Sequence, residues 1–341
     1  MERVRLAVVG QGYFAQVAIL PAFAYAENCA LTALFSDDPG KQQELRKRYH
    51  VEHALSYSEY DEFLRSGAVD AVYLALPNDM HCEYTVRAAR AGVHVLCEKP
   101  MAVSSEECER MIRACDEAHV KLMVAYRLHF EEANLSTLEM LKKGELGTPR
   151  YFLSAFSLQV KQGNIRTQSE RGGGPLFDIG VYCINASRYL FGAEPVEVMA
   201  AQATRPDDER FREVPEQVSA IMSFPEQRLA TFTCGFGAVD EGFYDVVCSE
   251  GRVRLDPAYE YAIGLHQQVT RADGKSKTKD FKKRDQIAAE LVYFANCLLN
   301  DQTPEPSGWE GLADLRVIEA IQESSRTGQR VPVKAIEREV R

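Results

Sequence analysis

A lysine at the end of a short apolar run is the residue of this chain best placed to do chemistry. The run 93–97 is typical of a buried parallel strand, and Glu98-Lys99-Pro100 follows it directly. Ligands of open α/β sheets bind at the carboxyl ends of the strands, so we expect Lys99 at that edge. The proline keeps Lys99 out of helical geometry. A partly desolvated lysine there can orient a substrate hydroxyl and help to move its proton, whereas on an open surface it would only be solvated.

A glycine-rich turn follows the first predicted strand, residues 5–9. It has the G-x-G-x-x-A pattern of dinucleotide binding and comprises Gly10, Gln11, Gly12, Tyr13, Phe14 and Ala15. Gly10 permits the tight turn, Gly12 lets the backbone approach a pyrophosphate, and the next helix directs its N-terminal amides at the phosphates. The turn therefore predicts a dinucleotide site that includes Gly10, Gly12, Tyr13 and Phe14, and together with Lys99 on the same sheet edge it suggests hydride-transfer chemistry.

The end of the second predicted strand, residues 30–35, bears on which dinucleotide binds. A carboxylate there would accept hydrogen bonds from the adenosine ribose and repel a 2′-phosphate, but Ser36 occupies this position. Lys41, one turn later, is a candidate partner for that phosphate. Asp37 comes one position late and could still reach the ribose, or Asp37 and Asp38 could simply begin the next helix. We expect NADP in preference to NAD, and use of both stays open.

A proline and an asparagine follow the third predicted strand, in Leu76-Pro77-Asn78. They predict a loop over the cofactor, with His81 in the first turn of the next helix. A helix-capping role for Asn78 or Asp79 is the alternative.

The second half of the chain contributes a carboxylate and a phenol. The glycines 172–174 predict a loop that can approach a ligand closely, and Pro175 suits a first helical position. Asp178 and Tyr182 are four residues apart and so share one helix face. If a lysine faces them, the carboxylate, the phenol and the lysine together can accept and donate a proton. Taken alone, an acidic residue at a helix start and a half-buried tyrosine are ordinary structural features.

The patterns of strands and helices that must position these residues divide the chain in two. Over residues 1–126, buried strands (5–9, 30–35, 69–76, 93–97, 120–125) alternate with helices (39–49, 58–66, 79–91, 104–118), and Pro21 shortens or kinks the first helix. This alternation predicts an α/β Rossmann domain, a doubly wound parallel sheet.

Residues 127–341 predict an α+β domain for substrate binding and oligomerisation. Period-two segments (149–160, 196–204, 217–224, 228–236, 243–249, 252–255) indicate a large, mostly antiparallel sheet, with helices at 175–191, 285–300 and 310–327. We expect the charged stretch 273–283 to be an exposed loop.

Composition excludes several classes of partner. A net charge of −10 over 341 residues argues against binding to nucleic acid or to an anionic membrane surface. No apolar run reaches the roughly 18 residues that a membrane span needs, and no signal segment precedes the first strand. Nine cysteines without a C-x-x-C pair fit reduced thiols, so we expect a cytoplasmic protein. The seven histidines show no metal-binding spacing, and we expect no metal.

These motifs together resemble the glucose–fructose oxidoreductase/inositol dehydrogenase family over nearly the whole chain. The resemblance rests on the glycine-rich turn, Leu76-Pro77-Asn78 with His81, Glu98-Lys99-Pro100, and the segments 126–131, 172–180 and 311–320. It implies that Lys99 is the catalytic lysine, Asp178 its acidic partner and Tyr182 the proton donor or acceptor. Many members carry histidine at the last position, so tyrosine favours the glucose–fructose oxidoreductase branch.

The resemblance also implies further site residues and an assembly. Glu98 would approach the nicotinamide ribose, and Arg127 the nicotinamide or its ribose. Family members usually associate through the open face of the second sheet, so we expect a homodimer or homotetramer. Glucose–fructose oxidoreductase is exported and has an N-terminal extension that helps to hold NADP. This chain begins at the first strand, so we expect a cofactor that exchanges.

The resulting hypothesis is an NAD(P)-dependent oxidoreductase that transfers hydride between nicotinamide and a hydroxyl or carbonyl carbon of a sugar or related polyol. Whether Lys99 or Tyr182 is the formal base stays open. One alternative is a dehydrogenase or reductase of a non-sugar cyclic diol, with Phe156, Phe177 and Phe236 as candidates to line an apolar pocket. Another is a nucleotide-binding regulatory protein that has kept the fold without the chemistry.

Overall fold

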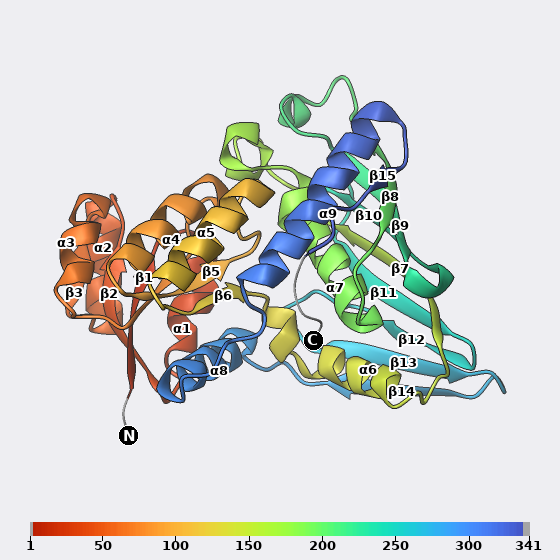
Figure 1. The fold of residues 1–341 in the computed structure, drawn as a ribbon, viewed down its shortest axis with the longest axis horizontal. Helices are drawn as coiled ribbons and strands as arrows, with labels where there is room; N and C mark the ends of the chain where they lie inside the picture. Colours follow the sequence, from red (N-terminus) through yellow and green to blue (C-terminus); the bar gives the residue numbers. More distant parts are fainter. Residues whose placement is uncertain (1–2, 337–341) are drawn as a thin grey trace. The chain divides into compact units, whose positions relative to one another are not determined.

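The chain folds into two units in the computed structural model, which describes residues 3–336 (Figure 1). The first unit contains the described residues up to Phe130 together with Asp285–Leu312. The second contains Glu131–Arg284 and the described residues from Ala313 onward. The predicted boundary after residue 126 falls close to the first crossing, but residues 285–312 return to the first unit.

The first unit is built on a parallel sheet with the strand order β3-β2-β1-β4-β5-β6, the order of dinucleotide-binding folds. Its strands are β1 (Val4–Val9), β2 (Cys29–Phe35), β3 (His53–Leu55), β4 (Ala71–Leu74), β5 (His94–Glu98) and β6 (Leu122–Ala125). All residues of β4 and β6 are buried, as a sheet covered on both faces requires. The order reverses beside β1, so the edge beyond β1, β4 and β5 is the ligand side of this sheet.

The helices of this unit begin and end close to the predicted positions. They are α1 (Leu20–Ala22), α2 (Pro39–Tyr49), α3 (Tyr60–Arg65), α4 (His81–Arg90), α5 (Ser105–Glu117) and α8 (Gln286–Leu299). Pro21 lies in α1, which is short as predicted and continues a π-turn at Ala15–Ile19. Ser104 caps α5 by accepting a hydrogen bond from the Glu107 amide. The late helix α8 packs on β1 and β2 beside α1 (Figure 1).

The second unit is built on a mixed sheet of nine described strands, in the order β14-β13-β12-β11-β7-β10-β9-β8-β15. The strands are β7 (Pro149–Ser157), β8 (Glu197–Ala203), β9 (Gln217–Phe224), β10 (Arg228–Gly235), β11 (Glu241–Cys248), β12 (Gly251–Leu255), β13 (Leu265–Arg271), β14 (Ser276–Phe281) and β15 (Val331–Pro332). Only the pair β10 and β7 is parallel among the described pairs of this sheet. The predicted fold class, a Rossmann sheet followed by a mostly antiparallel sheet, is confirmed.

The helices of the second unit contact its sheet, at β13, β7 and β8 in chain order. They are α6 (Glu132–Lys142), which the sequence patterns did not predict, α7 (Val181–Phe191) and α9 (Gly308–Thr327), whose first residues belong to the first unit. Along β7, Phe152, Ser154 and Phe156 are buried while Tyr151 and Leu153 are exposed. This alternation leaves one face of the sheet open to solvent.

The prediction of a loop over 273–283 is wrong, because Ser276–Phe281 is the edge strand β14. It pairs antiparallel with β13: Ser276 lies opposite Thr270 at one end, and Phe281 lies opposite Leu265 at the other. The lysines that suggested a solvated loop protect an exposed sheet edge from pairing with another chain.

No helix within residues 3–336 is long and apolar enough to cross a membrane. The nine cysteines are free thiols with buried side chains.

Candidate active site

The glycine-rich turn after β1 combines a tight backbone crossing with open space. Gly10 has φ +94°, and a Cβ there would lie 2.4 Å from the carbonyl oxygen of Ala75. Only glycine therefore lets the loops after β1 and β4 cross. At Gly12 a Cβ would meet nothing within 4 Å. The Gln11 side chain is 3% exposed, and its amide oxygen and nitrogen have no hydrogen-bond partner among the described residues. A buried amide without a partner beside open space suits a bound polar ligand.

The two predicted aromatic residues of this turn differ in exposure. The Tyr13 side chain is 78% exposed, whereas Phe14 is half-buried.

The loop after β2 fixes the residues predicted to select the cofactor. The Ser36 hydroxyl accepts a hydrogen bond from the Asp38 amide at 3.2 Å. Asp38 caps α2 by accepting from the Lys41 amide at 3.0 Å, as the structural alternative predicted. The Asp37 carboxylate accepts from the Tyr57 amide at 3.0 Å. Both carboxylates are therefore engaged with backbone, and the Lys41 ammonium lies 3.6 Å from Asp38 at the start of the helix.

His81 ties together the loops that follow β4 and β5. Its ring is fully buried, with Nδ1 2.9 Å from the Pro100 carbonyl oxygen and Nε2 2.9 Å from that of Leu76. Burial lowers the pKa of His81, which favours the neutral ring. Pro77 and Asn78 precede and begin the short helical turn that leads into α4. These contacts give His81 a structural role: the ring holds together the two loops that carry Leu76, Asn78 and Lys99.

Glu98 and Lys99 stand at the end of β5, where the sequence predicted them. The Tyr73 hydroxyl on β4 donates to Glu98 Oε1 at 2.8 Å, and the Lys99 amide lies 3.3 Å from Glu98 Oε2. Burial raises the pKa of the Glu98 carboxyl, and the charges of Lys99 and Arg127 partly oppose that effect. The Lys99–Pro100 peptide bond is cis. Because β5 ends at Glu98, the backbone of Lys99 lies at the ligand edge of the sheet.

Two buried polar residues of α8, Gln286 and Glu290, lie near Arg127 and Glu98 and were not predicted from the sequence. Arg127 is 4% exposed and donates through Nη1 to Gln286 Oε1 at 2.8 Å. One turn along α8, the fully buried Glu290 carboxyl has no hydrogen-bond partner among the described residues. Burial, and then the Glu98 carboxylate, raise the pKa of Glu290 well above its ordinary value. The available signal was a glutamine and a glutamate four residues apart on a mostly apolar helix.

Asp178 pairs with an arginine that sequence reasoning also missed. A π-turn, Leu176–Gly180, carries Asp178 into α7. Arg166 Nε lies 2.6 Å from Asp178 Oδ2, and the two side chains are 45% and 19% exposed. The Asp178 carboxylate is the main cause that raises the pKa of Arg166, and the nearby Tyr182 and Tyr261 add to it. No motif marked Arg166, because it stands alone in a polar stretch.

Aromatic rings surround Tyr182 on α7. Its ring meets Phe156 edge-on at 5.6 Å and Tyr259 at 6.0 Å between centroids, and Phe156 stacks on Tyr259 at 4.9 Å. Of the predicted pocket aromatics, Phe156 therefore lies beside Tyr182. Phe236 is fully buried in the core and Phe177 is 7% exposed.

The predicted catalytic residues are divided between the two units. Lys99 belongs to the first unit, and Asp178 and Tyr182 belong to the second. Each unit thus holds its own part of the predicted set, with its own positioning residues: Tyr73 and Glu98 in the first, Arg166 and Phe156 in the second.

Two family models match the chain. The model of an oxidoreductase family with an NAD-binding Rossmann fold matches residues 4–126, and the model of the GFO/IDH/MocA C-terminal domain matches residues 135–254.

Curated and solved relatives match along nearly the full chain. D-xylose 1-dehydrogenase [NADP(+)] of Haloarcula marismortui is 34% identical over 95% of this chain and 91% of its own length. The structure of aldose–aldose oxidoreductase from Caulobacter crescentus, complexed with glycerol, has a TM-score of 0.93 at 36% identity, covering 97% of this chain and 100% of that one. The structure of a 3-ketoreductase from Actinomadura kijaniata with NADP and TDP-benzene has a TM-score of 0.86 at 27% identity, covering 95% and 98%.

These matches confirm the predicted oxidoreductase, and the cofactor that two of these relatives carry in their names agrees with the predicted preference for NADP. The chain belongs to the glucose–fructose oxidoreductase/inositol dehydrogenase (GFO/IDH/MocA) family of NAD(P)-dependent oxidoreductases.

Proposed function

We propose that this protein is a cytoplasmic, NADP-dependent oxidoreductase that transfers hydride at a hydroxyl or carbonyl carbon of a sugar or related polyol. One observation carries the proposal: Lys99 follows β5 directly, on the sheet edge that also holds the glycine-rich turn after β1. A relative named as a xylose dehydrogenase and another named as an aldose–aldose oxidoreductase support sugars as the substrate class. The nine free, buried thiols suit a reducing compartment.

The first unit has features that fit a dinucleotide. The space beside Gly12 and the buried amide of Gln11 are suited to a polar group at the turn. Gly10, Gly12, Tyr13 and Phe14 would hold the pyrophosphate, Ser36 and Lys41 the adenosine end, and Leu76, Pro77 and Asn78 the middle of the cofactor. Glu98 and Arg127 would hold the nicotinamide end, and His81 would act by fixing the two loops that carry these residues.

In the proposed reaction, the protein supplies proton handling and orientation. When bound, NADP supplies a nicotinamide that accepts or returns hydride. During oxidation, Lys99 orients the substrate hydroxyl, and Tyr182 or Lys99 takes its proton. Asp178, held by Arg166, positions the substrate or Lys99. Proton transfer of this kind contributes on the order of 10²- to 10⁴-fold to the rate.

A non-sugar cyclic diol is the second candidate substrate. The observation that favours it is the ring cluster of Phe156, Tyr182 and Tyr259, since apolar faces beside the proposed acid–base residue suit a less polar ring.

The first test is reduction of NADP and of NAD, measured separately, with aldoses, inositols and cyclic diols as substrates. We expect turnover with a sugar and with NADP. Turnover only with cyclic diols would support the second candidate. A protein that binds nucleotide but turns over none of these compounds would contradict the proposal and favour a regulatory role. Nucleotide that stays bound through purification would show a cofactor that does not exchange.

The role of Lys99 is tested by Lys99→Met. We expect turnover to fall at least 100-fold, while the affinity for NADP measured by fluorescence changes little, because the glycine-rich turn is untouched. Lys47→Met, at an exposed position on α2, is the matched control and should behave as the wild type. Wild-type turnover in Lys99→Met would overturn the assignment of Lys99.

We further propose assembly into a homodimer or homotetramer through the open face of the second unit's sheet. Five exposed apolar side chains form what we call the sheet-face patch: Tyr151, Leu153, Met199, Ile221 and Leu229. The strand register places Tyr151 beside Leu229, and aligns Leu153, Thr231, Ile221 and Met199 in one row across four strands. Apolar side chains so grouped on a sheet face are typical of a protein interface.

A further inference from the structure

Arg166 is held in place by the glycine run that precedes α7. Its amide donates to Asn164 Oδ1 at 3.0 Å, and its carbonyl oxygen accepts from the Gly174 amide at 2.8 Å. A Cβ on Gly173 would lie 2.6 Å from that same carbonyl oxygen. The close approach that the glycines permit is therefore to the backbone of Arg166, whereas the sequence had suggested an approach to a ligand.

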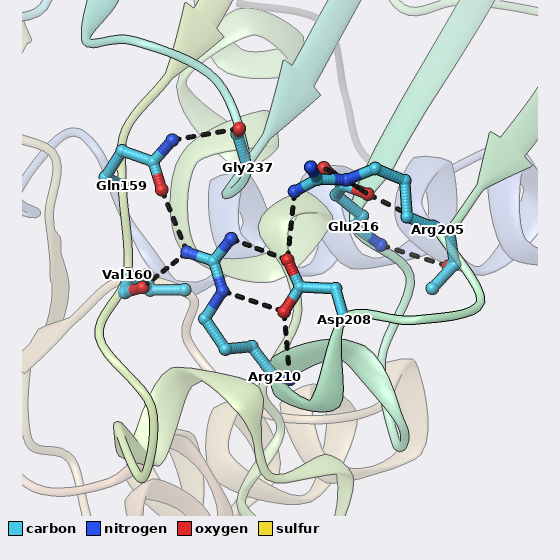
Figure 2. Close-up of polar contacts among 8 residues, drawn as sticks. Gln159, Val160, Arg205, Asp208, Arg210, Glu216 and Gly237 are labelled. Atoms are coloured by element: carbon cyan, nitrogen blue, oxygen red, sulfur yellow. Dashed lines mark hydrogen bonds and ion pairs between the residues drawn. The ribbon is translucent and has the colours of Figure 1, made fainter.

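The segment that carries Arg166 is also supported by the loop 204–216. The Ser169 amide donates to Glu213 Oε2 at 3.1 Å, and Gly174 lies next to Val214. This loop is itself fixed by two arginines, as Figure 2 shows. Arg210 pairs through Nη2 with Asp208 at 2.7 Å and reaches the Val160 carbonyl, and Arg205 bonds both Asp208 and Glu216. The backbone of Arg166 is therefore held by the glycine run, and the segment that carries it is supported by the loop 204–216.

Among the described residues, the Arg166 side chain donates one hydrogen bond, through Nε, which leaves its Nη1 and Nη2 groups available to a ligand. Its Nε bonds the Asp178 carboxylate at 2.6 Å. Within residues 3–336, its Nη1 and Nη2 groups donate no hydrogen bond, and the side chain lies near Tyr182 and Tyr261 and is 45% exposed. The guanidinium therefore presents donors beside the carboxylate and the phenol that the proposed function assigns to chemistry.

We propose that Arg166 is a substrate-binding, specificity-determining residue that acts with Asp178 on two neighbouring hydroxyl groups of the sugar. An Nη group of Arg166 donates to one hydroxyl oxygen, and the Asp178 carboxylate accepts from the adjacent hydroxyl. This inference rests on the proposed function and specifies its substrate class as compounds with a vicinal diol.

The charge balance favours a neutral diol over an anionic group. The Asp178 carboxylate already compensates the guanidinium charge at 2.6 Å, so a substrate carboxylate or phosphate would meet a pair of no net charge. A donor next to an acceptor matches a diol, because each hydroxyl can both donate and accept.

The test compares Arg166→Met with the wild type on the best sugar substrate and on its deoxy analogues, each lacking one hydroxyl. We expect kcat/KM of the variant to fall roughly 10- to 100-fold on the parent sugar, as for loss of a hydrogen bond to a charged group. On the analogue that lacks the bound hydroxyl, the variant and the wild type should differ little. Arg166→Lys keeps the charge without the planar fork, and we expect an intermediate loss.

Arg212→Met is the matched control, because Arg212 lies on the neighbouring loop with an exposed ion pair to Glu209. Equal losses of Arg166→Met on the parent sugar and on every deoxy analogue would overturn the proposal and show a structural role. A larger loss on the corresponding uronic acid would show an anion site instead. If the wild type turns over no sugar, the proposed function fails separately, and calorimetric binding of the same compounds decides whether Arg166 binds the diol.

Discussion

At the scale of single residues, the first unit holds two carboxyl groups in one buried polar region. Glu98 is bonded by Tyr73, whereas Glu290 has no hydrogen-bond partner within the described chain. Burial and the Glu98 carboxylate raise the pKa of Glu290, and the charge of Arg127 opposes that effect. We infer that Glu290 is neutral in the folded protein, because a second buried negative charge beside Glu98 would be strongly unfavourable.

The pH dependence of stability tests the state of Glu290. Its folded pKa is raised above the unfolded value, so below the unfolded pKa both states are protonated and the group has no effect on stability. Above it, only the unfolded state releases the proton, and the free energy of unfolding falls as the pH rises toward the folded pKa. Glu290→Gln should remove this fall, and the gain over the wild type between pH 5 and pH 8 should exceed about 1 kcal/mol.

The measurement is urea unfolding of both proteins across that pH range. Glu44→Gln, at an exposed position on α2, should leave the pH dependence of the wild type unchanged. Parallel curves for Glu290→Gln and the wild type would mean that Glu290 is ionised in the folded state.

At the scale of elements, the two glycines of the turn after β1 have different roles, one in the fold and one in ligand binding. Gly10 has a positive φ and no room for a Cβ beside Ala75, whereas the space at Gly12 is open. The same motif therefore contains one residue required by the fold and one available to a ligand.

Paired alanine substitutions distinguish these two roles. We expect Gly10→Ala to lower the free energy of unfolding by about 2–4 kcal/mol, from strain and steric overlap. Gly12→Ala should keep the wild-type Tm but weaken NADP binding by roughly tenfold or more, because a methyl group occupies the space the pyrophosphate needs. Thermal unfolding and fluorescence titration measure the two effects. A Gly12→Ala variant with wild-type affinity would exclude that turn as the phosphate site.

At the scale of the whole molecule, the sheet-face patch bears on assembly. The patch lies on the face of the second sheet opposite to its helices, and Leu153 and Ile221 lie in the same row of it. We expect the wild type to sediment as a dimer or tetramer, and Leu153→Asp/Ile221→Asp to sediment at a lower mass, because burying two carboxylates without partners is costly. Val239→Asp, at an exposed apolar residue outside the patch, is the control. A monomeric wild type, or a double variant of unchanged mass, would contradict assembly through this face.

The sequence by itself determined the elements whose signals are local. The helix α2 has the predicted bounds because Asp38 and Pro39 begin it, and β9 has them because its side chains alternate strictly between core and solvent. The glycine-rich turn and the anchored Lys99 were also predictable, since a strand that ends at a motif fixes the position of that motif at the sheet edge.

Only the tertiary structure decided the features that depend on residues far apart in the chain. The strand β14 exists because β13 supplies its hydrogen bonds, and residues 285–312 join the first unit by packing α8 on β1 and β2. The partners Arg166–Asp178 and Arg127–Gln286 belong to no local pattern, because their contacts span 12 and 159 residues. Periodicity and capping report short-range energetics, whereas charge pairing and strand-edge pairing are set by which surfaces the folded chain brings together.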